Sequence, residues 1–169
     1  KSSAKNITKL MIKRKAYSEW ESLNKAKKIV IKLPDNQKYF LLGKTSICMP
    51  DKLSDKELSD IERECKPINK YYAKNRINDN VDNLRLITMP FGGYDVDNII
   101  SEDPDVKFVP FPTLNKALIR LLNYGIVPMN KLGLFNFDIK GSNILYYEPN
   151  ARLIDWGLSG IKTAHNKIP

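Results

Sequence analysis

Two aspartates and an asparagine lie within short apolar runs in the last third of the sequence. Asp138 precedes Asn143 by five residues, and Asp155 follows the next apolar run. An amide oxygen and a carboxylate that converge on one point suit Mg²⁺, which takes oxygen ligands and completes its shell with phosphates and water. Asn143 and Asp155 are therefore the predicted metal ligands.

Asp138 and Lys140 have the chemistry to act on a group in transfer. The single histidine of the chain is His165, far along the sequence from Asp138. This carboxylate is therefore better suited to orienting a hydroxyl and accepting its proton than to a Ser–His hydrolysis. Lys140 offers a point positive charge to an anionic group. Both residues are predicted to be catalytic.

A β-hairpin is predicted to position these side chains. Its strands cover residues 143–147 and 152–155, and the turn Glu-Pro-Asn-Ala at residues 148–151 joins them. A hairpin brings its two ends together, so Asn143 and Asp155 can face the same point. The alternative is that they are ordinary polar residues of a surface hairpin.

The apolar spacing elsewhere predicts further helices and strands. A helix is expected over residues 6–28, because its apolar residues fall on one face. Ser54 and Glu57 form a capping box that begins a helix over residues 54–66. A leucine stripe from Leu114 predicts a helix that Gly125 ends. Extended segments are expected at residues 29–31, 38–42 and 83–89, and an irregular connection at 67–83.

Composition sets limits on the class of protein. The chain has 169 residues, and 42% of them are hydrophobic, which is enough for a core. No apolar run approaches the ~20 residues of a membrane helix, and no secretory signal pattern is present. Cys48 and Cys65 lack a metal-type spacing and are expected to be free thiols in a reducing compartment. We therefore expect a reducing compartment and a cytoplasmic location.

The net charge of +9 permits a polyanionic partner. However, the lysines are spread along the chain, with a mild concentration at residues 13–28. Aromatic and basic residues do not alternate as they do on RNA-binding sheets. A solvated basic surface is therefore favoured over a nucleic-acid interface.

The two polar motifs together resemble the catalytic loop and metal loop of protein kinases. GLFNFDIKGSNIL resembles the pattern H-R-D-L-K-x-x-N-I-L, and LIDWG resembles the strand that ends in D-F-G. The resemblance implies an α+β, bilobal kinase-like fold and transfer of phosphate from ATP, with Mg²⁺, to Ser or Thr hydroxyls of a protein substrate. Asp138, Lys140, Asn143 and Asp155 would be its site residues.

The resemblance extends upstream of these motifs. NLRLITMPFGGYDV resembles the last strand of the kinase N-lobe and the hinge, where adenine would bind near Met89, Phe91 and Gly92. Residues 1–89 would then be the N-lobe portion. Residues 90–113 would be the hinge and connector, and 114–169 the C-lobe portion with both loops.

Two alignments compete for the front of the chain. In one, Ile-Val-Ile-Lys at residues 29–32 imitates V-A-I-K, so Lys32 pairs with phosphate and residues 54–66 are the partner helix. In the other, residues 6–28 are the partner helix, and Glu19 or Glu21 faces the nucleotide. The second is preferred because the first leaves no strand between its helix and Leu84.

The second alignment implies an incomplete kinase domain. The Gly-rich loop and the strand lysine would precede Lys1, and the helical bundle would follow Pro169. No G-x-G-x-x-G occurs in the chain. Asn136 replaces the His of the motif, which is expected to weaken the support of the metal loop, and Phe137 replaces its Arg. Trp156 keeps a large aromatic residue beside Asp155.

These departures leave a second function open. The chain could be a kinase-derived structural or binding protein with weak catalysis, that is, a pseudokinase. KLPDNQKYFLL and MPFGGYD resemble the divergent kinase-like proteins of large DNA viruses. This resemblance implies a virion or capsid component with viral structural proteins as partners.

Overall fold

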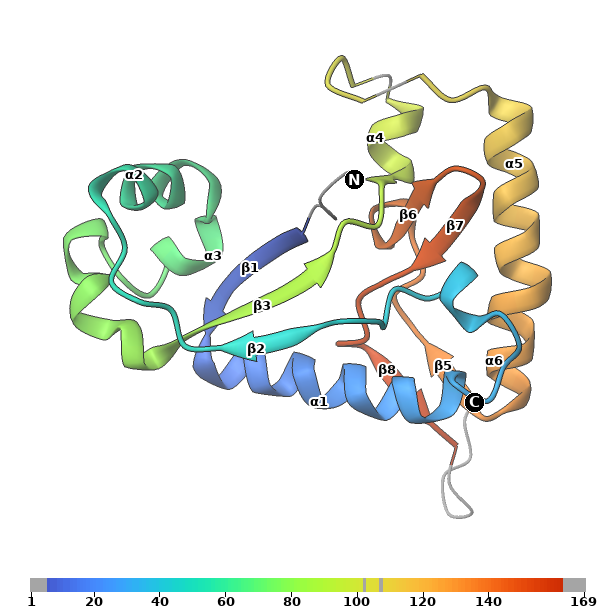
Figure 1. Ribbon diagram of the computed structural model, residues 1–169, viewed down its shortest axis with the longest axis horizontal. Coiled ribbons are helices and arrows are strands. Elements are labelled where there is room, and N and C mark those ends of the chain that lie inside the picture. The colour runs from blue at the N-terminus through green and yellow to red at the C-terminus, as the bar shows by residue number, and fades with distance from the viewer. Residues whose placement is uncertain (1–5, 102, 107, 163–169) are drawn as a thin grey trace. The chain divides into compact units, whose positions relative to one another are not determined.

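The computed structural model describes residues 6–101, 103–106 and 108–162. The chain mixes helices with small antiparallel sheets and divides into two compact units (Figure 1). Unit 1 comprises Lys1–Glu21 and Lys44–Phe91, and unit 2 comprises Ser22–Gly43 and Gly92–Pro169. Within the described residues, every helix is too short or too polar to cross a membrane.

Unit 1 contains a three-stranded antiparallel sheet in the order β1-β3-β2. Its strands are β1 (Asn6–Ile12), β2 (Ser46–Cys48) and β3 (Leu84–Pro90). Strand β1 pairs with β3 along its whole length, from Asn6 opposite Pro90 to Ile12 opposite Leu84. Figure 1 shows β3 between the other two strands.

Helix α1 (Lys13–Val30) begins directly after β1. The predicted helix over residues 6–28 is therefore wrong for Asn6–Ile12. Ile7, Leu10 and Met11 fit a helical stripe, but the same spacing is compatible with a strand. Pairing with β3 satisfies the backbone groups of this segment across the sheet instead.

Short helices follow β2 in unit 1. They are α2 (Asp55–Glu64), α3 (Lys66–Asn69), η2 (Lys74–Arg76) and η3 (Asn78–Asn83). The capping box is confirmed: the Ser54 side chain accepts from the Glu57 backbone N–H, and the Glu57 carboxylate accepts from the Ser54 backbone N–H. Leu58, Ile68, Ile77 and Leu84 form the buried apolar cluster of this unit.

Unit 2 contains two further antiparallel sheets, in the orders β4-β6-β7 and β5-β8. The helices in this part of the chain are η1 (Asn36–Lys38), α4 (Val96–Ile100), α5 (Phe111–Arg120), the π-helical η4 (Leu121–Ile126), α6 (Val127–Lys131) and η5 (Gly141–Asn143). The strands are β4 (Tyr94–Asp95), β5 (Leu134–Asn136), β6 (Ile144–Tyr147), β7 (Asn150–Leu153) and β8 (Ser159–Ile161).

The predicted hairpin at the end of the chain is confirmed. Strands β6 and β7 pair from Ile144 opposite Leu153 to Tyr147 opposite Asn150. The turn is shorter than expected, because Asn150 and Ala151 already belong to β7. The hairpin therefore leads from Asn143 at its start to Asp155 just beyond its end.

Three other sequence predictions are wrong in unit 2. Ile29 and Val30 lie in α1 rather than in a strand, so the alignment that made Lys32 the strand lysine is also wrong. Residues 38–42 form no strand; Phe40 makes a single bridge with Leu153. Val30 and Phe40 are buried, so their apolar character reflects core packing.

Gly125 does not end the helix that begins in α5. The helical path continues through η4 into α6. Gly125 is buried, and a Cβ at this position would lie 2.9 Å from the Cβ of Tyr39. The glycine is therefore explained by close packing and not by a helix end.

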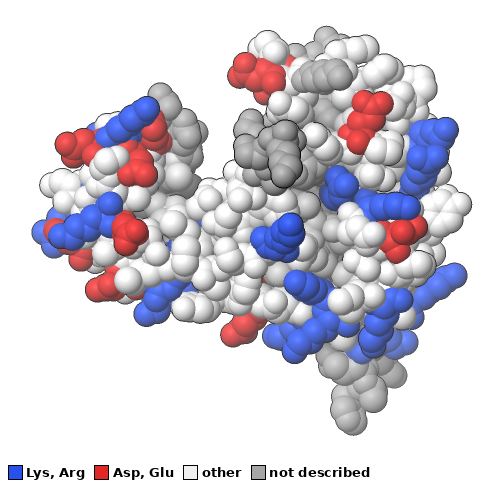
Figure 2. All heavy atoms as spheres, in the orientation of Figure 1, with Lys and Arg blue, Asp and Glu red and all other residues white. Residues whose placement is uncertain are grey.

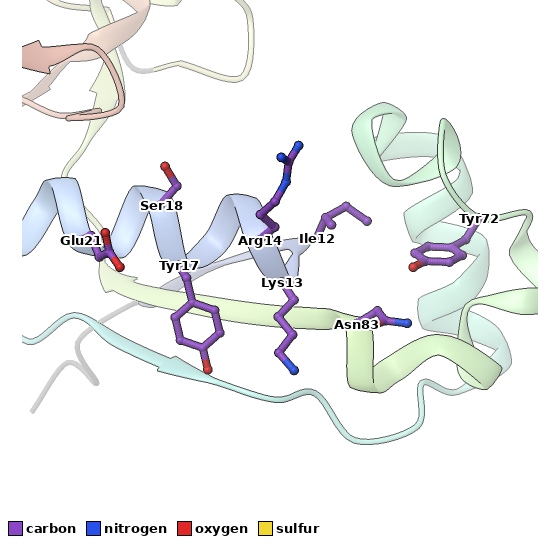
Figure 3. Close-up of a pocket in the computed structure, with 8 residues that line it drawn as sticks. All are labelled: Ile12, Lys13, Arg14, Tyr17, Ser18, Glu21, Tyr72 and Asn83. Atoms are coloured by element: carbon purple, nitrogen blue, oxygen red, sulfur yellow. The ribbon is translucent and has the colours of Figure 1, made fainter.

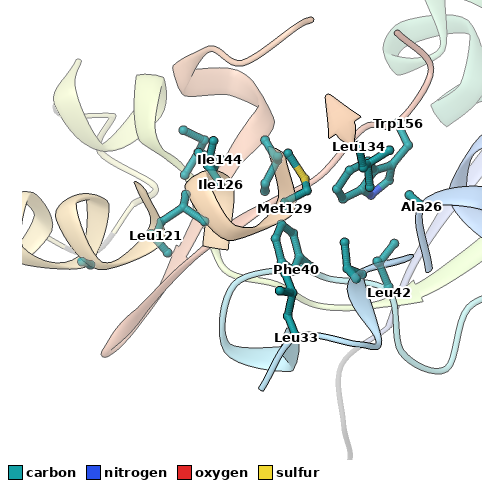
Figure 4. Close-up of a cluster of buried hydrophobic side chains, with 14 of the residues drawn as sticks. Ala26, Leu33, Phe40, Leu42, Leu121, Ile126, Met129, Leu134, Ile144 and Trp156 are labelled. Atoms are coloured by element: carbon teal, nitrogen blue, oxygen red, sulfur yellow. The ribbon is translucent and has the colours of Figure 1, made fainter. Parts of the chain in front are cut away.

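The core of unit 2 includes residues that adjoin both polar loops in the sequence, among them Leu134, Ile144 and Trp156 (Figure 4). Leu134 and Leu153 are fully buried, and Trp156 is 2% exposed. The rings of Trp156 and Phe40 have centroids 5.8 Å apart. Each polar loop is thus flanked by a side chain that is anchored in the core.

Gly93 gives a direct test of this fold. Its φ is 107°, and a Cβ there would overlap the carbonyl oxygen of Tyr146. We expect Gly93→Ala to lower the free energy of unfolding by at least about 1–3 kcal/mol, the usual cost of such backbone strain. Gly43→Ala is the matched control, since a Cβ at Gly43 meets nothing within 4 Å. Equal midpoints of urea unfolding for both variants would contradict the expectation.

Candidate active site

Asp138, Lys140 and Asn143 form one polar cluster between β5 and β6. The Asn143 side-chain N–H donates to the Asp138 backbone carbonyl at 2.9 Å and to its carboxylate at 2.8 Å. The Lys140 ammonium lies 3.0 Å from the same carboxylate oxygen. The structure therefore brings together three of the residues that the sequence singled out.

The electrostatics of the cluster favour an ionised Asp138. The hydrogen bond from Lys140 lowers the pKa of the Asp138 carboxyl; burial opposes this effect, and the hydrogen bond from Asn143 adds to it. The carboxylate is thus charged at neutral pH and can accept a proton or a hydroxyl hydrogen bond. Its side chain remains 28% exposed, so a substrate can approach it.

Asn136 links this cluster to the loop of Asp155. Its side-chain N–H donates to the Asp155 backbone carbonyl at 2.8 Å. Its side-chain oxygen accepts from the Asp138 backbone N–H at 2.9 Å. Asn136 is 7% exposed. The asparagine in the place of the motif's His therefore still joins the two loops, a role that residue type alone did not reveal.

The backbone around Asp155 is held at several points. Its φ is 58°, a left-handed conformation that few residues other than glycine adopt, although Asp tolerates it. The Gly157 N–H donates to the Asp155 carboxylate at 3.0 Å. The Ile154 N–H donates to the Asn143 carbonyl at 2.9 Å. Asn143 is thus bonded to the residue next to Asp155.

The side-chain oxygens of Asn143 and Asp155 are of the type that Mg²⁺ takes as ligands. In the described part of the chain, no group of three or more His, Cys, Asp or Glu side chains could hold a metal. Mg²⁺ needs only one or two protein oxygens, because phosphates and water complete its shell. The Asn143 amide nitrogen faces Asp138, which leaves its oxygen for another partner. Asn143 and Asp155 remain the predicted ligands.

Unit 1 contains an ion pair that the sequence pattern did not predict. The Lys9 ammonium on β1 lies 2.9 Å from the Glu19 carboxylate on α1. Glu19 was a predicted site residue, but Lys9 was placed in a helix and not considered as its partner. Residues 6–12 do not alternate polar and apolar side chains, so no local signal marked this segment as a strand. The pair shows that this chain does carry a lysine on the strand before the helix.

Glu21, the other candidate on α1, has different surroundings. It lines an open pocket of about 640 Å³ within unit 1. Figure 3 shows Glu21 and Tyr72 at opposite sides of this pocket. Glu19 therefore contacts a lysine, whereas Glu21 lines a pocket.

The residues proposed to bind adenine lie where unit 1 passes into unit 2. Met89 is within β3, opposite Ile7. Phe91 is the last residue of unit 1 and Gly92 the first of the second segment of unit 2. A Cβ at Gly92 would lie 2.6 Å from a Leu145 methyl carbon, so this glycine permits close packing. Adenine binding by these residues stays a prediction.

Comparison with known proteins supports the fold. No protein-family model and no curated protein matches the chain. A chain in the crystal structure of the yeast RNA Pol II CTD kinase CTDK-1 complex is similar, with a TM-score of 0.52 and 12% identity. The match covers 94% of this chain and 40% of that one, so this chain spans less than half the length of the solved chain.

The likeness is one of fold. At such low identity, the similarity shows a mixed α and β architecture like that of a chain in a kinase complex. This architecture is compatible with part of the expected kinase-like fold. The link to viral proteins and the incompleteness of the domain stay predictions.

Proposed function

We propose that the chain catalyses ATP-dependent phosphoryl transfer to a Ser or Thr hydroxyl of a protein. The observation that carries the proposal is the bonded arrangement of Asp138, Lys140 and Asn143, which Asn136 joins to Asp155. These residue types, in this order, are those of the kinase catalytic and metal loops. The fold likeness supports the same class of protein.

Each side chain has a role that follows from its chemistry. The ionised Asp138 would orient the acceptor hydroxyl and take its proton. Lys140 would turn its ammonium toward the phosphoryl group in transit. Asn143 and Asp155 would hold Mg²⁺. When it is bound, this ion neutralises part of the negative charge of the phosphates. Because phosphoryl transfer needs little covalent help, positioning by these residues would supply most of the rate.

The decisive experiment measures ATP binding by isothermal titration with and without Mg²⁺. The wild-type chain should bind ATP more tightly with Mg²⁺ than without it. In the presence of Mg²⁺, Asp155→Ala should bind ATP at least tenfold more weakly than the wild type. Asp51→Ala, at an exposed carboxylate of unit 1, serves as the control. Binding that is independent of Mg²⁺ in all three proteins would exclude the proposed metal site.

We also propose that Lys9, held by Glu19, is the phosphate-pairing lysine. In protein kinases, a strand lysine paired with a helix glutamate must be in place for transfer. This proposal replaces the expectation that the strand lysine precedes Lys1.

Lys9→Met should lower kcat/KM for transfer at least tenfold. Its unfolding midpoint should barely change, because exposed ion pairs contribute only about 0–1 kcal/mol. Lys38→Met is the matched control: Lys38 also forms a 2.9 Å ion pair, with Asp35, and its exposure of 49% is close to the 47% of Lys9. Equal rates in the two variants would refute the role of Lys9.

A second candidate is a kinase-derived binding or structural protein, with viral structural proteins as partners. The observation that favours it is that Asp138 is paired with Lys140 and Asn143 within the chain, so these polar side chains can serve as a structural network. In that case the wild-type chain would fold but transfer no phosphate to any peptide in a Ser/Thr peptide array.

A further inference from the structure

Unit 2 carries two adjoining pockets that phosphoryl transfer does not use. One, of about 450 Å³, lies among α4, the start of α5 and the β6–β7 hairpin. The other, of about 410 Å³, lies between α4 and α5. Both are of the size that holds ligand groups, roughly 300–1,000 Å³. They share Ile99, Phe108 and Val109, so they flank the same short segment, and we call them the paired pockets.

Large apolar side chains around the paired pockets are exposed to solvent. Phe108 is 78% exposed and Phe111 is 72% exposed. Ile100, Tyr94 and Tyr147 are exposed as well. A group of exposed apolar residues that is rimmed by polar ones marks an interaction surface on a soluble protein. Two hollows separated by one segment suit two side chains of an extended partner.

The charged residues that the structure describes in the walls of the paired pockets are acidic, whereas the whole chain is basic. Glu148 is the charged residue in the wall of the first pocket and Asp103 in that of the second; neither wall includes a Lys or Arg among the described residues. Between Arg85 and Lys107 the sequence has five acidic residues and no basic one, although the net charge is +9.

The distribution of charge over unit 2 is visible in Figure 2. Acidic side chains lie over the end that carries α4 and the loop after it, and basic side chains gather toward the end that carries α6. A polyanion such as nucleic acid would be repelled from the acidic end. A segment with basic residues beside apolar ones would be attracted to it.

We propose that the paired pockets bind an extended segment of a partner protein that presents two apolar side chains next to Lys or Arg. One apolar side chain would occupy each pocket, on either side of Phe108. The basic residue would lie beside Glu148 or Asp103. The proposal does not rest on phosphoryl transfer, because Asp138 lines neither pocket and the test measures binding alone.

The test is panning of a random phage-displayed peptide library on the full chain. Enriched peptides should combine apolar residues with Lys or Arg. As synthetic fluorescein-labelled peptides, they should bind Phe108→Glu at least tenfold more weakly in fluorescence polarisation. Glu148→Lys should also weaken binding and reduce its dependence on salt. Ile119→Glu is the matched control, since Ile119 is 49% exposed on α5 and lines neither pocket.

Several outcomes would overturn the proposal. The first is that panning on the wild-type chain enriches no peptides beyond those enriched on the Phe108→Glu chain. The second is that the enriched peptides are acidic, and the third is that they bind Phe108→Glu and Ile119→Glu with equal affinity. Thermal unfolding of each variant confirms that the fold is intact. Asp138→Asn should bind the enriched peptides as the wild type does, so failure of the catalytic proposal and failure of this one are separate results.

Discussion

Asp138→Asn is expected to reduce phosphoryl transfer by about 10²- to 10⁴-fold, the usual contribution of a general base. The change removes the negative charge but keeps a side-chain oxygen for the hydrogen bonds from Lys140 and Asn143. The cluster should therefore keep its shape. Because Asp138 is not a predicted metal ligand, Mg²⁺-dependent ATP binding should be retained.

The measurement is single-turnover transfer from labelled ATP to a Ser/Thr peptide, with ATP binding by titration alongside. Asp51→Asn is the control for removal of one surface carboxylate, and it should transfer at the wild-type rate. Wild-type transfer by Asp138→Asn would show that this carboxylate is not the base. Loss of ATP binding together with transfer would show that the residue supports the nucleotide site instead.

Trp156→Ala should be the most destabilising single change at the site. Trp156 is 2% exposed and packs on Phe40, and truncation of a buried Trp costs about 3–5 kcal/mol. That is a large part of the stability of an ordinary domain, about 5–15 kcal/mol. The midpoint of urea unfolding should therefore fall sharply.

Trp156→Phe is the informative partner of this variant. The indole N–H has no hydrogen-bond partner among the described residues. Phenylalanine removes this unpaired donor, and the gain offsets part of the lost contact area. We expect Trp156→Phe to unfold close to the wild type. If Ala and Phe at this position cost the same, the side chain is not held in the core as the structure has it.

Local signals explain the predictions that are confirmed. The capping box of Ser54 and Glu57 acts within four residues, so the sequence alone reveals the start of α2. The β6–β7 hairpin is set by a turn and two short strands that are neighbours in the chain. The contacts among Asp138, Lys140 and Asn143 also arise within one short loop, while the catalytic and metal-binding roles of these residues stay predictions.

Non-local pairing explains most of the errors. Strand β1 exists because it pairs with β3, and the Thr8 and Thr88 hydroxyls that meet across this ladder are 80 residues apart in the sequence. No local pattern contains that information. The ion pair of Lys9 with Glu19 was not predicted, because Lys9 was placed in a helix. Gly125 was assigned to a helix end because its contact with Tyr39 comes from a distant part of the chain.

The small β5–β8 sheet has a consequence for how the Asp155 loop is held in place. Its three residue pairs run from Leu134 opposite Ile161 to Asn136 opposite Ser159, and the Phe137 N–H extends them with a bond to the Leu158 carbonyl. The segment that carries Asp155 is thus tethered on both sides, by the β6–β7 hairpin before it and by the β5–β8 ladder after it. A change that breaks the three β5–β8 pairs would leave this segment tethered on one side alone.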